Sequence, residues 1–222
     1  RVPAEPKPLP YGAFWAMLDW WRGEGFERHA LTQRYDGASV MIGVLPTGKL
    51  NLAGTEKAAF FWSVKPEAFA QMRKDGLETW KAKVHAYWPE CTAFLDQISS
   101  FEDMTLAQYG HHTLLAPVGN RIAFVGDSAH STSPQLGQGA NMALLDARAL
   151  YHALETGSDV ADTLERYAKA RRWHMRLFQL LSAAFTPFYQ SDSAALAFIR
   201  DRMVSTIARI PPAPQFLASM VA

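Results

Sequence analysis

Alternation of apolar and polar residues dominates the first third of the chain and predicts β-strands. Four segments carry the pattern: 31–35, 38–45, 49–52 and 58–64. The first two are rich in Val, Ile, Tyr and Thr, and turn residues follow them at Asp36-Gly37 and at Pro46-Thr47-Gly48. We therefore expect a meandering antiparallel sheet, with one face packed on helices and the other free to line a cavity.

Helical spacing replaces this alternation after residue 65. Pro66 suits the first turn of a helix, where its missing N–H is not needed, and an apolar stripe follows at Phe69, Met72, Leu77, Trp80 and Val84. A second helix is predicted from Pro89-Glu90, with three side chains facing inward: Phe94, Leu95 and Ile98. Strand character returns at 105–115, so that residues 11–117 indicate an α+β unit.

A different order of elements begins at residue 122. Ile122–Val125 is a short, continuous apolar run, which is typical of a strand buried on both faces. A loop rich in Gly, Pro and Ser extends from there to Gly139, and Ala140–Leu154 has strong helix propensity. This strand–loop–helix order is that of half of a nucleotide-binding fold.

Two more helices are predicted near the end of the chain. The first has residues at three- and four-residue spacing, namely Leu164, Tyr167, Arg171, His174, Leu177 and Leu181. The second has the same spacing at Leu196, Ile199, Met203 and Ile207, and Pro211-Pro212 should end it.

These elements predict a chain of mixed α+β and α/β class. The proline-rich residues 1–10 are expected to be a linker, 11–117 a sheet-rich α+β domain, 118–157 a strand–loop–helix segment like half of a nucleotide-binding fold, and 158–222 C-terminal helices.

Composition narrows the classes of function. The 222 residues carry a formal net charge of +1, which argues against nucleic acid or an anionic membrane as the main partner. Arg171, Arg172 and Arg176 cluster around His174, and we expect a solvated helix face there. A single cysteine, Cys91, excludes an intrachain disulfide and a multi-cysteine zinc site. The chain has no apolar run of membrane-spanning length and no signal-peptide core, so we expect a cytoplasmic protein.

The loop from Gly126 to Asn141 contains residues suited to one kind of ligand. Gly126 allows close approach to the backbone, and the Asp127 carboxylate would accept short hydrogen bonds from ribose or ribityl hydroxyls. Gly137-Gln138-Gly139 leave free N–H groups at a helix N-terminus, which favours negative charge. A flavin has both features, a ribityl chain and a pyrimidine edge that becomes negative on reduction.

The same segment resembles the second FAD fingerprint of the para-hydroxybenzoate hydroxylase-like family, the group A FAD-dependent aromatic hydroxylases. The matching positions are Gly126, Asp127, Ala129, His130, Pro134, Gly137, Gly139, Asn141, Ala143, Asp146 and Ala147, and Ser128 replaces the usual alanine. The resemblance implies that Asp127 binds the ribityl hydroxyls, that Pro134 lies near the reactive C4a edge, and that Gly137, Gln138, Gly139, Ala140 and Asn141 hold the pyrimidine edge. It implies structural roles for His130 and Asp146. It also implies that residues 11–117 are a substrate-binding domain and that 118–157 are the closing segment of an FAD-binding Rossmann-like domain.

The resemblance also implies a reaction. NADH or NADPH would reduce FAD, O2 would add at C4a, and the C4a-hydroperoxyflavin would hydroxylate a small aromatic substrate. The chemistry is borne by the flavin, so no catalytic side chain is expected. Tyr35, Met41 and Trp62 are candidates for the wall of the substrate site, together with Pro134. The family's first fingerprint is absent, so we expect a Rossmann segment of roughly 150–180 residues to lie elsewhere, as a preceding segment or a partner chain.

Three alternatives stay open. Among flavin enzymes, the chain could belong to a related reductase or halogenase. The chain could be a non-catalytic flavoprotein fragment or interaction subunit. Gly126-Asp127-Ser128 also resembles the start of a GDS-type serine hydrolase, although the downstream Asp-x-x-His that would activate Ser128 is not present.

Overall fold

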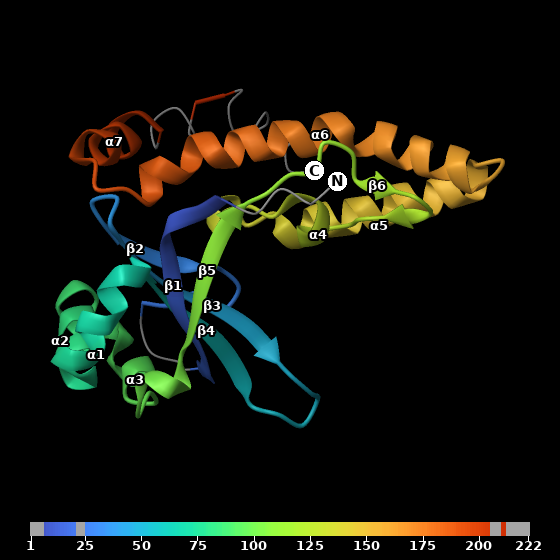
Figure 1. Ribbon diagram of the computed structural model, residues 1–222. Helices are drawn as coiled ribbons and strands as arrows, with labels where there is room; N and C mark the ends of the chain where they lie inside the picture. Colours follow the sequence, from blue (N-terminus) through green and yellow to red (C-terminus); the bar gives the residue numbers. More distant parts are fainter. Residues whose placement is uncertain (1–6, 21–24, 205–209, 212–222) are drawn as a thin grey trace. The chain divides into compact units, whose positions relative to one another are not determined.

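The computed structural model describes residues 7–20, 25–204, 210 and 211. The chain forms two compact units, one from Pro10–Gln108 with Phe188–Phe198, and one built mainly from Tyr109–Pro187. We call them the sheet unit and the helical unit, and the ribbon in Figure 1 shows the elements of both. The predicted mixed α and β class is confirmed by a five-stranded sheet combined with helices.

The sheet unit contains a sheet with strand order β2-β3-β4-β1-β5. Its strands are β1 (Lys7–Asp19), β2 (Thr32–Asp36), β3 (Val40–Lys49), β4 (Glu56–Val64) and β5 (Thr105–His111). The pairs β2–β3, β3–β4 and β1–β4 are antiparallel, as predicted. The predicted hairpin turn at Asp36-Gly37 is confirmed, because Gly37 has a φ of 55° between two paired strands.

One face of this sheet packs against short helices. These are η1 (Pro66–Ala68), α1 (Phe69–Asp75), α2 (Leu77–Tyr87), η2 (Pro89–Cys91), α3 (Thr92–Leu95) and η3 (Phe101–Asp103). Alternate residues of the strands supply the core, including Phe14, Ile42, Phe60 and Trp62. The three inward residues predicted near α3 are confirmed: Phe94, Leu95 and Ile98 are all buried.

Three local predictions in the sheet unit were wrong. The turn expected at Pro46–Gly48 is a register shift inside β3, so the strand continues to Lys49 because β4 still pairs with it there. The single helix expected from Pro66 is interrupted at Gly76, whose φ of 90° ends α1. Lys7–Pro10, expected in a linker, belongs to β1, whereas residues 1–6 lie outside the described part.

The helical unit holds the strand–loop–helix segment. Its elements are β6 (Val118–Gly119), β7 (Ile122–Ala123), α4 (Asp127–His130), η4 (Pro134–Leu136), α5 (Gly139–Thr156) and α6 (Val160–Tyr189). The predicted helix after Gly139 is confirmed as α5. The prediction that Ile122–Val125 is buried on both faces was wrong, because β7 pairs only with β6 among the described strands, and Ile122 and Val125 are exposed.

The chain passes from one unit to the other at Gln108 and Tyr109, earlier than the predicted boundary after residue 117. The functional division into a substrate part and an FAD part stays a prediction. Beyond α6, the structure describes α7 (Ala194–Ile199) and a π-helical turn at Arg200–Val204. Ile207 and Pro212 of the predicted last helix lie outside the described residues. In the described part, no helix is long and apolar enough to cross a membrane.

Candidate functional site

The loop between β7 and α5 begins with a backbone conformation that favours glycine. Gly126 precedes α4 with φ 58° and ψ −140°, a region that residues with a side chain rarely adopt. A Cβ atom added to Gly126 would lie 3.1 Å from the Cβ of Ala143 on α5. The glycine therefore allows both a sharp change of direction and the close approach of α5.

Asp127 follows directly and is the first residue of α4. Its side chain is exposed. Within the described part of the chain, no hydrogen bond or ion pair involves its carboxylate. An exposed carboxylate held on a loop and left without a protein partner is available to accept hydrogen bonds from a ligand's hydroxyl groups.

The segment before α5 is open. Gly137 adopts the left-handed conformation with a φ of 63°, and Gln138 at the helix start provides no side-chain cap. A Cβ atom added at Gly137 or Gly139 would meet nothing within 4 Å. Pro134, Gly139 and Ala140 are exposed. The first N–H groups of the 18-residue helix α5 are therefore accessible to an acceptor atom or a negatively charged edge of a ligand.

Polar atoms beside Pro134 also lack protein partners. Ser133 is 1% exposed, and among the described residues neither its Oγ nor the buried Nε2 of Gln135 has a hydrogen-bond partner. Burying a polar group without a partner is unfavourable. Asn141, by contrast, donates from Nδ2 to Oε1 of Gln138 at 3.0 Å. These orphaned atoms fit a polar ligand lying along the loop.

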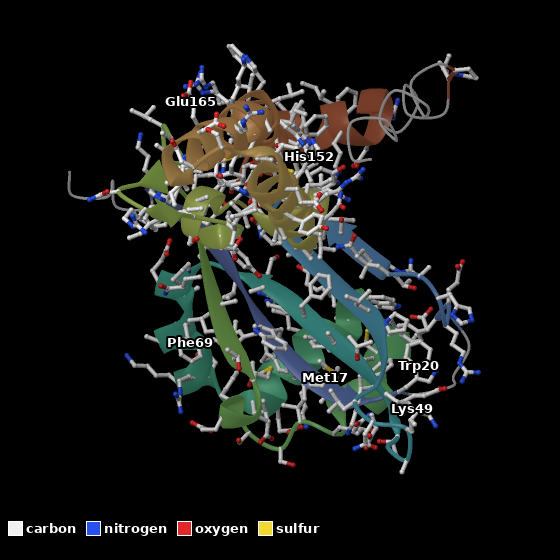
Figure 2. The ribbon with its side chains drawn as sticks, turned by 90° about the vertical axis from the view of Figure 1, so that its right-hand side faces the viewer. Met17, Trp20, Lys49, Phe69, His152 and Glu165 are labelled. Carbon is white, nitrogen blue, oxygen red and sulfur yellow. The ribbon has the colours of Figure 1, made fainter. Side chains whose placement is uncertain are left out.

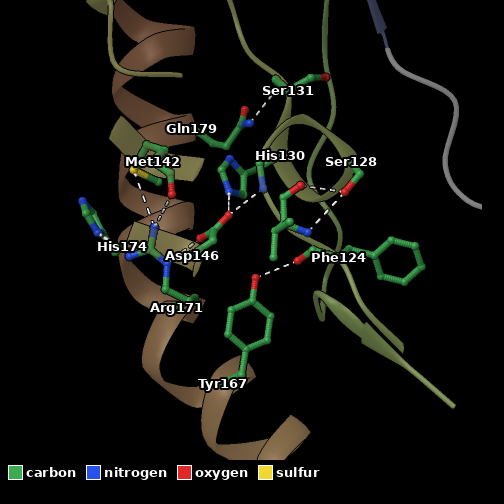
Figure 3. A network of polar contacts seen from close by, with 12 residues as sticks. Phe124, Ser128, His130, Ser131, Met142, Asp146, Tyr167, Arg171, His174 and Gln179 are labelled. Carbon is green, nitrogen blue, oxygen red and sulfur yellow. Dashed lines mark hydrogen bonds and ion pairs between the residues drawn. The ribbon is translucent and has the colours of Figure 1, made fainter. Parts of the chain in front are cut away.

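The buried carboxylate of Asp146 on α5 joins this loop to helix α6 (Figure 3). Asp146 on α5 is fully buried, and its Oδ2 accepts from the Gly126 N–H at 2.8 Å and from Nε2 of His130 at 2.6 Å. Its Oδ1 accepts from Nε of Arg171 at 2.6 Å. Burial by itself would raise the pKa of Asp146, but the hydrogen bonds from His130, Gly126 and Arg171 outweigh it and hold the pKa below the usual value. Asp146 is therefore an anion that fixes the loop.

The contacts of His130 and Ser128 bear on two questions: whether His130 has a structural role, and whether Ser128 could act as the nucleophile of a serine hydrolase. His130 is 2% exposed and its Nε2 is engaged by Asp146, which supports the structural role implied for it. The Ser128 hydroxyl donates to the carbonyl of Val125 at 2.7 Å and accepts from the N–H of Val125 at 3.2 Å. In the described part of the chain no histidine hydrogen-bonds to Ser128. The arrangement therefore offers no activated serine for a hydrolase.

Arg171 was predicted on a solvated face, and that prediction was wrong. Its side chain is buried, with the residue 4% exposed, because it pairs with the buried Asp146 from the neighbouring helix. A signal for this was present in the sequence. Arg171 occurs four residues after the buried Tyr167, within the stripe that defines the inward face of α6.

The residues predicted to line the substrate site do not share one face of the sheet. Tyr35 pairs with Met41 across β2 and β3, so these two lie on the same face. Trp62 pairs with Ile42 on the opposite face, where it is 3% exposed and packs against Trp80 and Tyr87. The role of all three in substrate binding stays a prediction.

Sequence reasoning missed other aromatic and apolar residues on the Tyr35 and Met41 face. Trp15 pairs with Phe61, and the Phe61 ring covers Gly43, where a Cβ atom would overlap it. Met17, which Figure 2 labels, is two residues further along β1 and therefore lies on the same face as Trp15. Trp15 and Met17 are 39% and 41% exposed. The register of the strands, which the alternation pattern alone does not give, brings these side chains together.

We expect Gly126→Ala to lower the free energy of unfolding by about 1–3 kcal/mol, the cost of holding a residue with a side chain in this conformation. Gly119→Ala is the matched control, because Gly119 has no positive φ and an added Cβ would make only ordinary contacts, at 3.9 Å or more. Urea denaturation of both variants measures the difference. Equal stability of the two variants would contradict the proposed strain at Gly126.

The sequence matches the family described as FAD binding domain over residues 27–179. It is 32% identical over 126 residues to 3-(3-hydroxy-phenyl)propionate/3-hydroxycinnamic acid hydroxylase of Burkholderia cenocepacia (strain HI2424), covering 54% of this chain and 23% of the relative. It is 29% identical over 110 residues to 6-methylpretetramide 4-monooxygenase of Streptomyces rimosus, covering 49% of this chain and 26% of the relative.

Solved structures with the same fold include a Klebsiella pneumoniae HpxO variant complexed with FAD, with a TM-score of 0.72 and 18% identity, covering 97% of this chain and 54% of that one. Pseudomonas aeruginosa PqsL in complex with 2-aminobenzoylacetate has a TM-score of 0.71 and 18% identity, covering 90% and 53%. This chain thus spans about a quarter of these curated relatives and about half of these solved chains. The resemblance to FAD-dependent aromatic hydroxylases is confirmed by these matches. Because residues 27–179 make up most of the chain, the protein belongs to the family of FAD-binding domains.

Proposed function

We propose that this chain is part of an FAD-dependent monooxygenase that hydroxylates an aromatic substrate with NADH or NADPH and O2. The observation that supports this most is the loop from Gly126 to Asn141, where an unpartnered carboxylate and an accessible helix N-terminus occur together in a member of an FAD-binding family. The relatives named above as a hydroxylase and a monooxygenase support the reaction class.

In this proposal the loop residues bind and orient the cofactor. Asp127 would accept hydrogen bonds from the ribityl hydroxyls, and the N–H groups at the start of α5 would bind the pyrimidine edge of the ring. Pro134 is exposed and would lie near the ring's reactive edge and the substrate. When bound, FAD supplies the redox chemistry, in which NAD(P)H and a proton are consumed, one oxygen atom of O2 enters the substrate and the other leaves as water.

The sheet unit supports the choice of an aromatic substrate. Tyr35 and Met41 share their face with Trp15, Met17 and Phe61, so this face offers several flat or flexible apolar side chains. Such surfaces favour flat, largely apolar ligands. Trp62 is a weaker candidate for contact with substrate, because its ring packs in the core on the other face.

The function is tested on the whole purified protein. We expect the absorption bands of a bound flavin, together with oxidation of NADH or NADPH that a phenolic substrate accelerates and a product heavier by one oxygen atom. Intact mass of the same sample shows which segments accompany this chain. A flavin-bearing protein that oxidises NAD(P)H without transferring oxygen to any phenol would contradict the monooxygenase, and a sample without flavin would favour the non-catalytic alternative.

Asp127→Ala should weaken FAD binding by about 1–3 kcal/mol, or roughly five- to 150-fold in Kd. The reason is that it removes a charged acceptor for the ribityl hydroxyls. Asp96→Ala is the matched control, because Asp96 is also exposed, follows the short helix α3 in the sheet unit, and should leave the Kd unchanged. Fluorescence titration of the apoprotein with FAD measures both. An unchanged Kd for Asp127→Ala would remove this residue from the site.

A further inference from the structure

Helix α6 contacts the chain just before and within the loop from Gly126 to Asn141, at Phe124 and at Ser131 (Figure 3). The Tyr167 hydroxyl donates to the carbonyl of Phe124 at 2.7 Å, just before the loop. Gln179 donates from Nε2 to the carbonyl of Ser131 at 2.8 Å, just after α4. Between these two contacts, Arg171 donates to the carboxylate of Asp146, which in turn accepts from the Gly126 N–H. We call Tyr167, Arg171 and Gln179 the α6 clamp.

Arg171 is the charged member of the clamp. Its Nε donates to Oδ1 of Asp146, which leaves Oδ2 free to accept from Gly126 and His130. Its Nη1 contacts Nδ1 of His174 at 2.8 Å. Burial and the neighbouring Arg171 charge lower the pKa of His174, so the neutral ring accepts this hydrogen bond. Each of these contacts restrains the guanidinium group, and with it the orientation of the Asp146 carboxylate.

We propose that Arg171 is a positioning residue for FAD, which orients Asp146 and thereby holds Gly126 and the adjoining Asp127 in the geometry that the ribityl chain requires. This inference rests on the FAD-binding role proposed for the loop. Nothing in it requires Arg171 to touch the cofactor. Its effect is transmitted through one carboxylate and one backbone N–H.

The local geometry explains why the clamp would act on binding as well as on stability. Gly126 has a backbone conformation that is rarely populated, and such conformations persist only where surrounding contacts hold them. Asp146 accepts from the Gly126 N–H, and the chain on either side is held where Tyr167 donates to the Phe124 carbonyl and Gln179 donates to the Ser131 carbonyl. If the Asp146 contact is lost, Gly126 can relax, and the direction of the Asp127 carboxylate changes with it.

The test is the Kd for FAD of the whole protein, with the visible absorption and circular dichroism of the bound flavin as a second readout. Arg171→Met keeps an unbranched apolar stem but removes the guanidinium group with its charge and its donors, and we expect the Kd to rise tenfold or more with an altered flavin spectrum. Arg171→Lys retains one charged donor and should restore part of the affinity. Arg172→Met is the matched control, because the neighbouring Arg172 is exposed, and its Kd should stay within twofold of wild type.

Tyr167→Phe keeps the test decisive if Arg171→Met does not fold. It removes only the hydroxyl that bonds to the Phe124 carbonyl, and we expect a Kd at least threefold above wild type. The proposal is overturned if folded variants lower the unfolding temperature of the apoprotein but keep the wild-type Kd and flavin spectrum. These readouts do not depend on turnover. A protein that shows the expected changes in Kd but transfers no oxygen supports the clamp and contradicts only the monooxygenase function.

Discussion

Replacing Asp146 with alanine should lower the free energy of unfolding by about 3–5 kcal/mol, the range for breaking a buried ion pair by removing one partner. The substitution leaves Arg171 as a buried charge without its carboxylate, and it also leaves the Gly126 N–H without an acceptor. Urea denaturation followed by circular dichroism measures the loss.

Two further variants make this result specific. Glu165→Ala is the surface control, because Glu165 on α6 (labelled in Figure 2) is exposed, and its effect on the free energy of unfolding should stay within about 0.5 kcal/mol. Combining Asp146→Ala with Arg171→Met removes both charges and should cost less than the sum of the two single changes. Strict additivity would show that the two residues do not act as a pair.

The same carboxylate predicts how stability depends on pH. The pKa of Asp146 is lower in the folded protein than the value of about 3.9 of an unfolded chain. The contribution of Asp146 to the free energy of unfolding is therefore fully present above that value, and it is lost as the pH falls through the lower folded-state pKa. Asp146→Asn should give a flatter fall in unfolding free energy from pH 5 downward than wild type. Other acids with lowered pKa, such as Asp162 and Asp192, are the same in both proteins and cancel. Parallel curves of unfolding free energy against pH for the variant and wild type would contradict the lowered pKa of Asp146.

Phe94→Ala should destabilise the sheet unit by about 3–5 kcal/mol, the usual cost of deleting a buried aromatic ring. Phe94 is fully buried, and its ring centroid lies 5.2 Å from that of Phe26 and 6.1 Å from that of Trp20. Leu52→Ala is the control, because Leu52 is fully exposed in the same unit. Tryptophan fluorescence during denaturation follows the sheet unit. Similar stabilities of the two variants would show that Phe94 is not part of the core.

The sequence alone was sufficient to predict secondary structure where the signal depends on neighbouring residues. Asp36-Gly37 predicted the turn between β2 and β3, and alternation predicted the antiparallel strands, because turn geometry and side-chain period depend on neighbouring residues. The same holds for the loop from Gly126 to Asn141. Gly126 and Gly137 both have a positive φ, and α5 begins where the sequence predicts it.

Tertiary structure decided what depends on residues far apart in the chain. Arg171 is 25 residues from Asp146. Its place in the stripe of α6 indicated an inward position, but the sequence does not show which carboxylate it pairs with. The faces of Trp62 and Met41 follow from strand register, which one inserted residue reverses. The exposure of Ile122 depends on which strands lie beside β7. The sequence by itself therefore determined the family and the loop that would bind FAD, whereas only the packing of α5 and α6 revealed which side chains hold that loop, because ion-pair partners and strand neighbours are set by distances in space.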